Sequence, residues 1–246
     1  MFERFLERLS KSAFCGKFIL KGGMLIAALV DIANRSTMDM DITIKNYPMD
    51  PGELAKAMKE ICSISIQDEV SFSFTGIGFI RDDDAYGGYR VGIRAVYDTI
   101  ITPMQIDITT GDAITPREVF YPFKMLFNEG TIGVWTYNIE TIIAEKVETI
   151  LRRGTFNTRS RDFYDVYILT KTQNFDPSIF LEALRATAGH RETTHIFTAM
   201  RKRVQEIKDD ETLKSRWIAY TKNYPYAEDI TYDDVMNALY LLTEYL

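Results

Sequence analysis

The spacing of apolar residues changes near residue 137, and this change constrains the fold more than any other feature of the chain. Before it, short apolar runs and period-two alternation predict strands interleaved with helices. From Asn138 onward, apolar residues recur at the spacing of an amphipathic helix. We therefore expect an α+β protein, with a mixed α/β domain over 1–137 and an all-α domain over 138–246. Helices are expected in the second domain over 139–151, 162–172, 177–188, 192–207, 210–221 and 231–246.

The first domain is expected to alternate strands and helices. An apolar run over 18–20 stops at Lys21-Gly22-Gly23, and a second apolar run over 24–32 follows at once. This order predicts a strand, a Gly-Gly turn and a helix. Asp50 followed by Pro51 is typical of a helix start. The remaining predicted elements are helices over 2–12 and 50–62 and strands over 38–44, 70–80, 89–97, 103–109 and 131–137.

Composition narrows the class of protein. The chain has 246 residues, of which 46% are hydrophobic, so it can bury a sizeable core. It contains no apolar stretch of about 18 residues, so we expect no contact with a membrane interior. The two cysteines are far apart and match no zinc or redox spacing, which favours a reducing cytoplasm. The net charge of −6 argues against a nucleic acid bound over the whole surface.

Two aspartates on one predicted strand form the most informative motif. Polar and apolar residues alternate over 38–44, so Asp39 and Asp41 point to the same face, about 7 Å apart. Mg²⁺ prefers hard oxygen ligands and is often bound by carboxylates together with substrate phosphates. Asp107, flanked by two isoleucines on another predicted strand, is a third acid that could lie beside this pair. The three acids are therefore candidate ligands of a divalent metal, Mg²⁺ or Mn²⁺.

A plainer interpretation of this motif stays open. An Asp-x-Asp pair on a strand is often only its solvated face. Against this, aspartate is disfavoured in strand interiors. Three carboxylates on one face would also repel each other unless a cation lies between them. We therefore favour a metal site formed by Asp39, Asp41 and Asp107.

The glycine pair and the loop before the acids are candidate phosphate ligands. Gly22-Gly23 would allow close approach of the backbone, and the free amides of the helix start suit phosphate oxygens. Lys21 could add a positive charge. Arg35, Ser36 and Thr37 could supply guanidinium and hydroxyl donors. A plain tight turn and a polar loop are the structural alternatives.

Basic residues gather between 146 and 161, although the chain as a whole is acidic. Such donors bind phosphates, but a solvated helix face explains them equally well. Lys146 differs because it lies within an apolar stripe, so we expect it to pair with Asp162 or with a phosphate. Asp162 and Asp165 could instead cap the next helix and hold the basic groups. The basic residues of this segment are Lys146, Arg152, Arg153, Arg159 and Arg161.

The order of these motifs along the chain is itself informative. A strand, a glycine pair and a helix come first, followed by Ser36, Asp39-x-Asp41 and Asp107, then Glu145-Lys146, Arg152 and Arg161-Asp162-x-Tyr164-Asp165. Over about residues 18–170, this order resembles the AbiEii/AbiGii toxin family of nucleotidyltransferases, which is related in fold to DNA polymerase β. The resemblance implies a nucleotidyltransferase-type mixed sheet followed by a helical domain.

The resemblance also implies roles for individual residues. Asp39, Asp41 and Asp107 would form a two-metal site, and the metal ions would activate an acceptor hydroxyl towards a nucleoside triphosphate. Lys146 would join these acids as a catalytic residue that contacts phosphates. The remaining candidates for nucleotide or phosphate binding are Lys21, Gly22, Gly23, Ser36, Thr37, Arg152, Arg161 and Asp162.

The acceptor and the partners follow from the resemblance alone. It implies transfer to an RNA, in particular a tRNA 3′ end, by the toxin of a toxin–antitoxin or abortive-infection system that has a cognate antitoxin. Such proteins typically have Ser or Thr after the glycine pair, whereas this chain has Met24. The alternatives are an enzyme of the same fold that modifies a small-molecule or protein hydroxyl, and a non-catalytic nucleotide-binding protein. Met24 is the best hint of the non-catalytic alternative.

Overall fold

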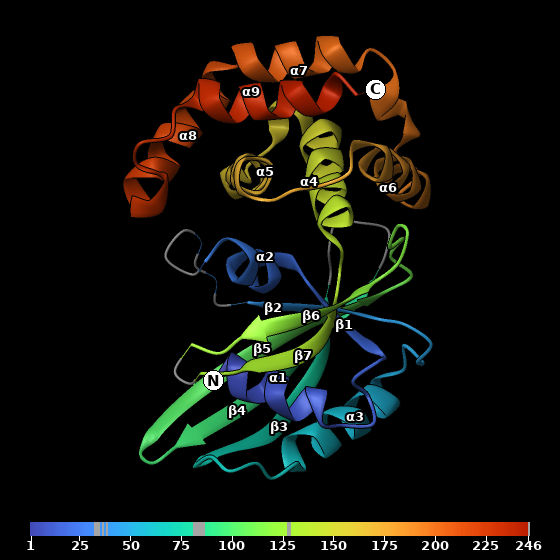
Figure 1. The fold of residues 1–246 in the computed structure, drawn as a ribbon, viewed down its shortest axis with the longest axis vertical. Coiled ribbons are helices and arrows are strands. Elements are labelled where there is room, and N and C mark those ends of the chain that lie inside the picture. Colours follow the sequence, from blue (N-terminus) through green and yellow to red (C-terminus); the bar gives the residue numbers. More distant parts are fainter. Residues whose placement is uncertain (32–34, 36, 38, 81–86, 127–128, 246) are drawn as a thin grey trace. The chain divides into compact units, whose positions relative to one another are not determined.

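The computed structural model describes residues 1–31, 35, 37, 39–80, 87–126 and 129–245, which form two compact units. The first unit comprises Met1–Ala28, Thr37–Asp112 and Glu118–Tyr137. The second comprises Leu29–Ser36, Ala113–Arg117 and Asn138–Leu246. Strands lie in the first unit and helices make up most of the second, which confirms the predicted α+β fold class (Figure 1).

A mixed seven-stranded sheet forms the first unit among the described residues, in the order β3-β4-β5-β2-β1-β7-β6. The β3–β4 and β4–β5 pairs are antiparallel, as the predicted hairpin requires. In the centre of the sheet, β2 runs parallel to β5 and antiparallel to β1. The strands are β1 (Phe18–Lys21), β2 (Met40–Ile44), β3 (Val70–Ile80), β4 (Gly88–Tyr97), β5 (Ile100–Thr110), β6 (Val119–Lys124) and β7 (Thr131–Thr136).

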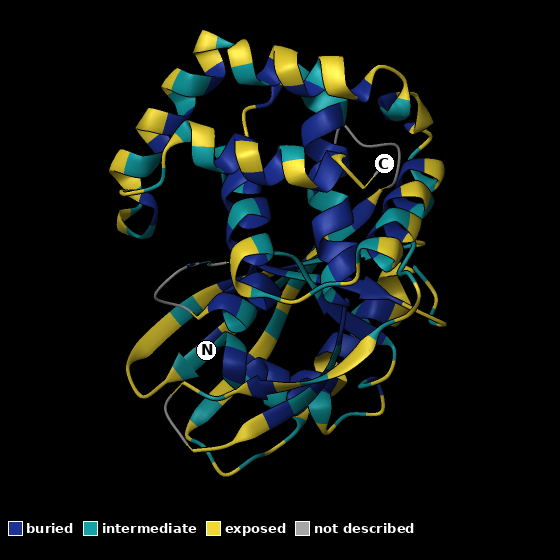
Figure 2. Cartoon of the chain, turned by 45° about the horizontal axis from the view of Figure 1, so that its top comes forward, coloured by how far each residue is buried: buried dark blue, intermediate teal, exposed yellow. Residues whose placement is uncertain are grey.

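One face of this sheet is apolar and lies under two helices, α1 (Phe2–Ser10) and α3 (Pro51–Ser63) (Figure 1). Phe5 of α1 meets Phe72 of β3 with ring centroids 5.9 Å apart. Along β4 and β5, buried positions alternate with more exposed ones, so the second face remains accessible to polar side chains (Figure 2). The alternation leaves one layer of apolar core and one polar face on the same strands.

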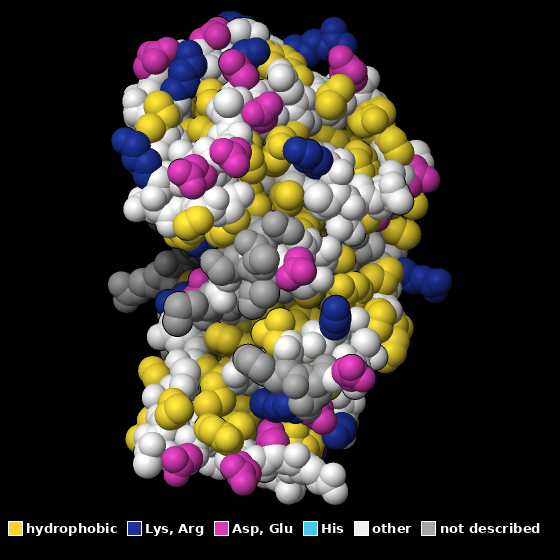
Figure 3. All heavy atoms as spheres, turned by 60° about the vertical axis from the view of Figure 1, so that its left-hand side comes forward, with side chains coloured by type: hydrophobic (Ala, Val, Ile, Leu, Met, Phe, Trp, Pro, Cys, Tyr) yellow, Lys and Arg dark blue, Asp and Glu magenta, His cyan; other side chains and the backbone are white. Residues whose placement is uncertain are grey.

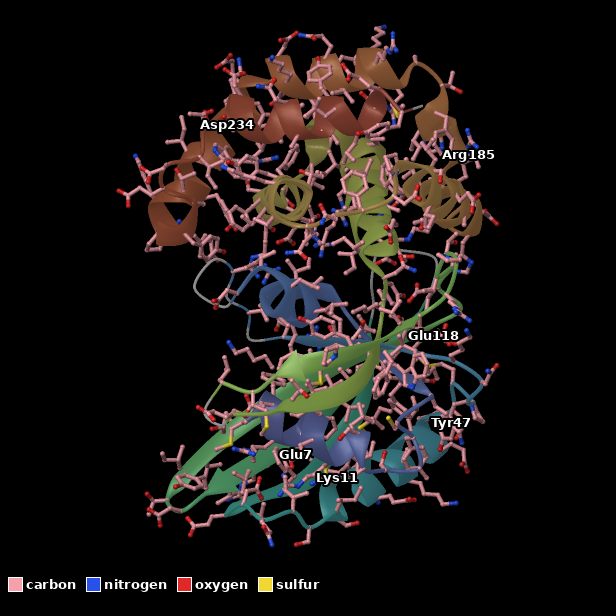
Figure 4. The ribbon with its side chains drawn as sticks, in the orientation of Figure 1. Glu7, Lys11, Tyr47, Glu118, Arg185 and Asp234 are labelled. Atoms are coloured by element: carbon pink, nitrogen blue, oxygen red, sulfur yellow. The ribbon has the colours of Figure 1, made fainter. Side chains whose placement is uncertain are left out.

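Local capping and ion pairing act at the ends of the helices of this unit. The Asp50 carboxylate caps α3 by accepting hydrogen bonds from the amides of Gly52 and Glu53, at 2.9 and 3.0 Å. Lys11, the C-cap residue of α1, pairs with Glu7 one turn earlier, at 2.9 Å (Figure 4). A third helix, α2 (Gly22–Val30), follows β1 directly.

Helices packed around α4 (Ile139–Arg153) form the second unit. α4 contacts α5 (Ser160–Thr172) and α6 (Pro177–His190), and α5 contacts α9 (Tyr232–Thr243). The Asn138 side chain caps α4 by accepting the amide of Thr141 at 2.8 Å. Among the described residues of this unit, the other elements are α7 (Met200–Asp209), α8 (Glu211–Asn223) and short 3₁₀ turns at Gly154–Phe156, Thr194–Phe197 and Pro225–Ala227.

Three expectations about elements need correction. The helix expected over 192–207 begins only at Met200, because Glu192 and Ala199 adopt positive φ angles of 54° and 56°. The glycine pair forms no separate turn, since Gly22 and Gly23 are the first residues of α2. The strand β6 was not predicted, because its exposed Val119 and Phe120 give no alternation.

None of the helices in the described part of the chain combines the length and apolar character that crossing a membrane requires.

Candidate active site

Four charged residues face one another across the polar side of the central sheet. Lys21 of β1 is the register partner of Asp41 of β2, which is the partner of Asp107 of β5, which in turn is the partner of Arg90 of β4. Register partners on neighbouring strands share a face of the sheet and lie about 5 Å apart. The result is a row of charges, which we call the charged row, with two carboxylates in the middle and a cation at each end.

Asp39 extends the acidic part of the charged row along the chain. It precedes Asp41 by two residues, is exposed, and its amide hydrogen-bonds to the Thr37 hydroxyl at 3.3 Å. Between the two aspartates, Met40 points to the opposite face and is fully buried. Because β2 begins at Met40, Asp39 lies just before the strand that carries Asp41, and a shared face for the two carboxylates remains a prediction.

The first residue of α2 fits closely against the Asp41 side chain. Gly22 has a positive φ of 67°, a conformation that suits glycine. A Cβ at this position would overlap the Asp41 carboxylate, lying 2.7 Å from its Cγ. The helix start thus brings backbone next to a carboxylate of the charged row. Met24, two residues further on in α2, is buried and supplies packing there.

Asp107 is held by a bidentate ion pair. The Nε and Nη2 atoms of Arg90 each donate to one oxygen of its carboxylate, both at 2.7 Å. These hydrogen bonds and the charge of Asp107, assisted by the charges of Asp39 and Asp41, raise the pKa of the Arg90 guanidinium. Arg90 was not predicted from the sequence, although its place on the polar face of an alternating strand is a signal that could have found it.

Another carboxylate of the first unit, that of Asp112, pairs with Lys21 of the charged row. Its Oδ2 accepts hydrogen bonds from Lys21 Nζ at 2.5 Å and Tyr137 OH at 2.9 Å. The hydroxyls of Thr43 and Thr109 donate to the same oxygen at 2.6 and 2.9 Å. Burial would raise the pKa of Asp112, but the Lys21 charge and these hydrogen bonds outweigh it and lower the pKa. Asp112 was not predicted from the sequence.

The carboxylates of the charged row fit a divalent cation. Within the described residues, no group of three or more acidic, histidine or cysteine side chains converges on one point, and the Asp107 carboxylate is turned to Arg90. Asp39, which is exposed, and Asp41, which is half-buried, offer carboxylate oxygens two residues apart in the chain. Such a pair suits Mg²⁺ or Mn²⁺, because these ions keep several water ligands and take phosphate oxygens as well.

The second unit contains a buried ion network, which we call the Lys146 network. Lys146 Nζ contacts Asp162 Oδ1 at 2.6 Å and Asp165 Oδ2 at 3.0 Å. Arg35 Nε approaches the other oxygen of Asp165 at 3.0 Å. The Asp165 side chain is 0% exposed and that of Arg35 2%. At the rim, the exposed Arg159 reaches Asp162 Oδ2 at 3.4 Å.

Mutual stabilisation keeps these groups charged. Burial alone would lower the pKa of Lys146, but the two carboxylates raise it. Burial would likewise raise the pKa of Asp165, but Lys146 and Arg35 lower it. Two cations and two anions balance in a site from which water is largely excluded. The pairing of Lys146 with Asp162 is one of the two outcomes that the sequence left open; its contact with a phosphate remains a prediction.

The other predicted phosphate ligands of the second unit also have protein partners. Arg152 pairs with the buried Glu148 at 3.0 Å, and the guanidinium of Arg161 donates to the Tyr224 hydroxyl at 2.9 Å. Arg161 also lies over the Tyr224 ring, 5.3 Å from its centroid. Ser36 lies outside the described residues. For Arg152 and Arg161, as for Lys21, Gly22, Gly23 and Thr37 of the first unit, phosphate binding remains a prediction.

Comparison with protein families identifies the class. The model of the family described as nucleotidyl transferase AbiEii toxin, of type IV toxin–antitoxin systems, matches residues 4–238. The chain belongs to this family, which confirms the resemblance inferred from the order of its motifs. Family membership makes the chain an enzyme of the nucleotidyltransferase class.

Solved structures show the same fold. A Helicobacter pylori protein assigned as a nucleotidyltransferase is 17% identical with a TM-score of 0.55, and the match covers 99% of this chain and 90% of that one. JHP933 from Helicobacter pylori is also 17% identical with a TM-score of 0.54, over 99% of this chain and 87% of that one. A comparison with curated proteins finds no match.

Proposed function

We propose that this protein is a metal-dependent toxin that transfers a nucleotide from a nucleoside triphosphate to an RNA hydroxyl, in particular the 3′ end of a tRNA. The observation that carries this proposal is the register of β2 and β5, which pairs Asp41 with Asp107 beside Asp39. Membership of a family of nucleotidyl-transferring toxins supports the reaction class. We propose the cytoplasm as its site of action, since that compartment contains both substrates.

Asp39 and Asp41 would hold the metal ion, with Asp107 as a third carboxylate next to them. A bound Mg²⁺ or Mn²⁺ supplies charge stabilisation of the triphosphate and activation of the attacking hydroxyl. In the overall reaction, the acceptor oxygen forms a bond to the α-phosphorus while the bond to the leaving pyrophosphate breaks. The chain itself contributes the fixed spacing of the acids and the glycine backbone at Gly22, which leaves room next to Asp41.

The surface charge is compatible with a localised acceptor site. The net charge is −6, and on the face drawn in Figure 3 basic and acidic side chains are interspersed. An RNA held by a few phosphate contacts at one end needs no uniformly basic surface, because the electrostatic part of affinity scales with the number of phosphates neutralised. A small-molecule or protein hydroxyl as acceptor is an outcome that the following experiment distinguishes.

The test is a transfer assay with each of the four α-³²P-labelled nucleoside triphosphates, Mg²⁺ and total RNA. We expect one or more labels to enter RNA of tRNA size, and none with the Asp41→Asn variant or after chelation of the metal. If the label enters only protein or a small molecule, the acceptor is that molecule and not RNA. Equal transfer by wild type and Asp41→Asn would refute the metal site.

The toxin role is tested in cells. Induced expression of the wild type should arrest growth, and Asp41→Asn at equal protein level should not. Co-expression of a cognate antitoxin should relieve the arrest. If the variant arrested growth as strongly as the wild type, the arrest would not come from transfer at the charged row.

A further inference from the structure

Arg90 is a cation of the charged row that contacts Asp107, a candidate metal ligand, directly. It forms two parallel hydrogen bonds of 2.7 Å to Asp107, with its side chain 50% exposed and that of Asp107 26% exposed. Parallel bonds of this kind fix both partners in one plane. Both oxygens of the Asp107 carboxylate are thereby directed along the sheet towards β4, away from its register partner Asp41 on β2.

Arg90 also balances the charge of more than one acid. Asp39, Asp41 and Asp107 bring three negative charges to this part of the sheet, and Lys21 at the other end of the row is held by Asp112. Asp41 is the register partner of Asp107, so its carboxylate lies on the strand next to the Arg90–Asp107 pair. Without a metal ion, Arg90 therefore relieves the repulsion that three adjacent carboxylates would otherwise suffer.

We propose that Arg90 is an internal counter-cation that occupies Asp107 in the metal-free enzyme and must release it when a divalent metal binds. This proposal rests on the proposed function, since it takes the three acids as metal ligands. Arg90 is thus a positioning residue. It lowers the affinity for the metal in the absence of substrate, and it holds the Asp107 carboxylate until the metal ion replaces it.

The environment of the pair suits such an exchange. A half-exposed ion pair is weakened by water and can open readily. The second unit offers the contrast, because Arg35 and Asp165 are 2% and 0% exposed and cannot part without burying an unpaired charge. The Arg90–Asp107 pair has the geometry of a strong ion pair in a location where it can be broken.

The test is Mn²⁺ binding without nucleotide, measured by electron paramagnetic resonance on the full chain. We expect Arg90→Gln to bind Mn²⁺ about tenfold more tightly than the wild type, since a positive charge next to the ion is removed. Arg94→Gln is the matched control. Arg94 lies four residues after Arg90 on the same face of β4, and its register partner is Pro103 rather than an acid. It should bind Mn²⁺ as the wild type does.

Thermal melting with and without metal separates an effect on metal binding from a folding defect. Because the metal-free variant loses its counter-cation, Arg90→Gln should melt below the wild type in chelator and gain more from saturating Mg²⁺. If Arg90→Gln does not fold, Arg90→Lys takes its place, with a gain in Mn²⁺ affinity of about threefold because Lys cannot hold the carboxylate in a bidentate way.

The possible failures are distinguishable. If Asp41→Asn abolishes Mn²⁺ binding but Arg90→Gln binds like the wild type, the counter-cation proposal is wrong and the metal site stands. If Arg90→Gln binds Mn²⁺ more weakly, Arg90 supports metal binding rather than opposing it, and the proposal is again wrong. If Asp41→Asn binds Mn²⁺ as the wild type does, both the metal site and the role of Arg90 are refuted.

Discussion

Charge balance in the Lys146 network leads to a quantitative prediction about stability. Replacing Lys146 by Met leaves Asp162 and Asp165 to share Arg35 and the exposed Arg159. Removing one partner of a buried ion pair costs about 3 kcal/mol of folding stability, because the other partner stays buried without its counter-charge. Asp162→Asn leaves two cations on Asp165 and should cost about 2 kcal/mol, because Asp162 lies nearer the rim.

The double variant distinguishes a network from independent contacts. Lys146→Met with Asp162→Asn removes one cation and one anion, so the Arg35–Asp165 pair remains balanced. We expect a total cost of about 3 kcal/mol instead of the additive value of about 5 kcal/mol, a coupling of about 2 kcal/mol.

The chain provides a local probe and a control for this cycle. Its two tryptophans lie in different units, Trp135 in β7 and Trp217 in α8, so a Trp135→Phe background reports urea unfolding of the second unit by fluorescence. Lys202 and Glu206 form an exposed pair at 3.7 Å, and the same cycle there should show coupling below about 0.5 kcal/mol. Additive costs at Lys146 and Asp162, within that same margin, would refute the network.

Two further predictions concern the first unit. Gly22→Ala should reduce nucleotide transfer at least about tenfold, because a Cβ at this position displaces the Asp41 side chain. The same substitution should cost about 1 kcal/mol of folding stability, because the φ angle of Gly22 is positive. The control Gly16→Ala, at a position with open space around it, should leave transfer unchanged. Since the folded state lowers the pKa of Asp112, wild-type stability should fall as the pH drops below about 5. Asp112→Asn should flatten that profile and cost about 2 kcal/mol of stability at pH 7, because it removes a carboxylate that Lys21 contacts. Transfer assays with thermal melts check the first, and urea titrations across pH 3–7 check the second; an active Gly22→Ala or an unchanged pH profile would contradict them.

Local patterning was sufficient for much of the fold. The alternation around Asp39 and Asp41 predicts β2 because a period of two has one structural interpretation. The cap at Asp50 locates the start of α3 to the residue. The helix start at Met200 was mispredicted because periodicity does not report the positive φ of Ala199.

Ion pairs between residues far apart in the chain could not be predicted from the sequence. Arg35 lies 130 residues from Asp165, and nothing local marks the two as partners. Arg90 meets Asp107 through the register of two long strands, which only the folded sheet defines.

The central claim, that Asp41 is a metal ligand in nucleotidyl transfer, is tested most directly by metal rescue of Asp41→Cys. A thiolate binds Mg²⁺ poorly and softer ions such as Cd²⁺ well. We predict that Asp41→Cys loses label transfer in Mg²⁺ and recovers part of it in Cd²⁺, whereas Cd²⁺ does not stimulate the wild type. Transfer by Asp41→Cys in Mg²⁺ at the wild-type rate would contradict the account.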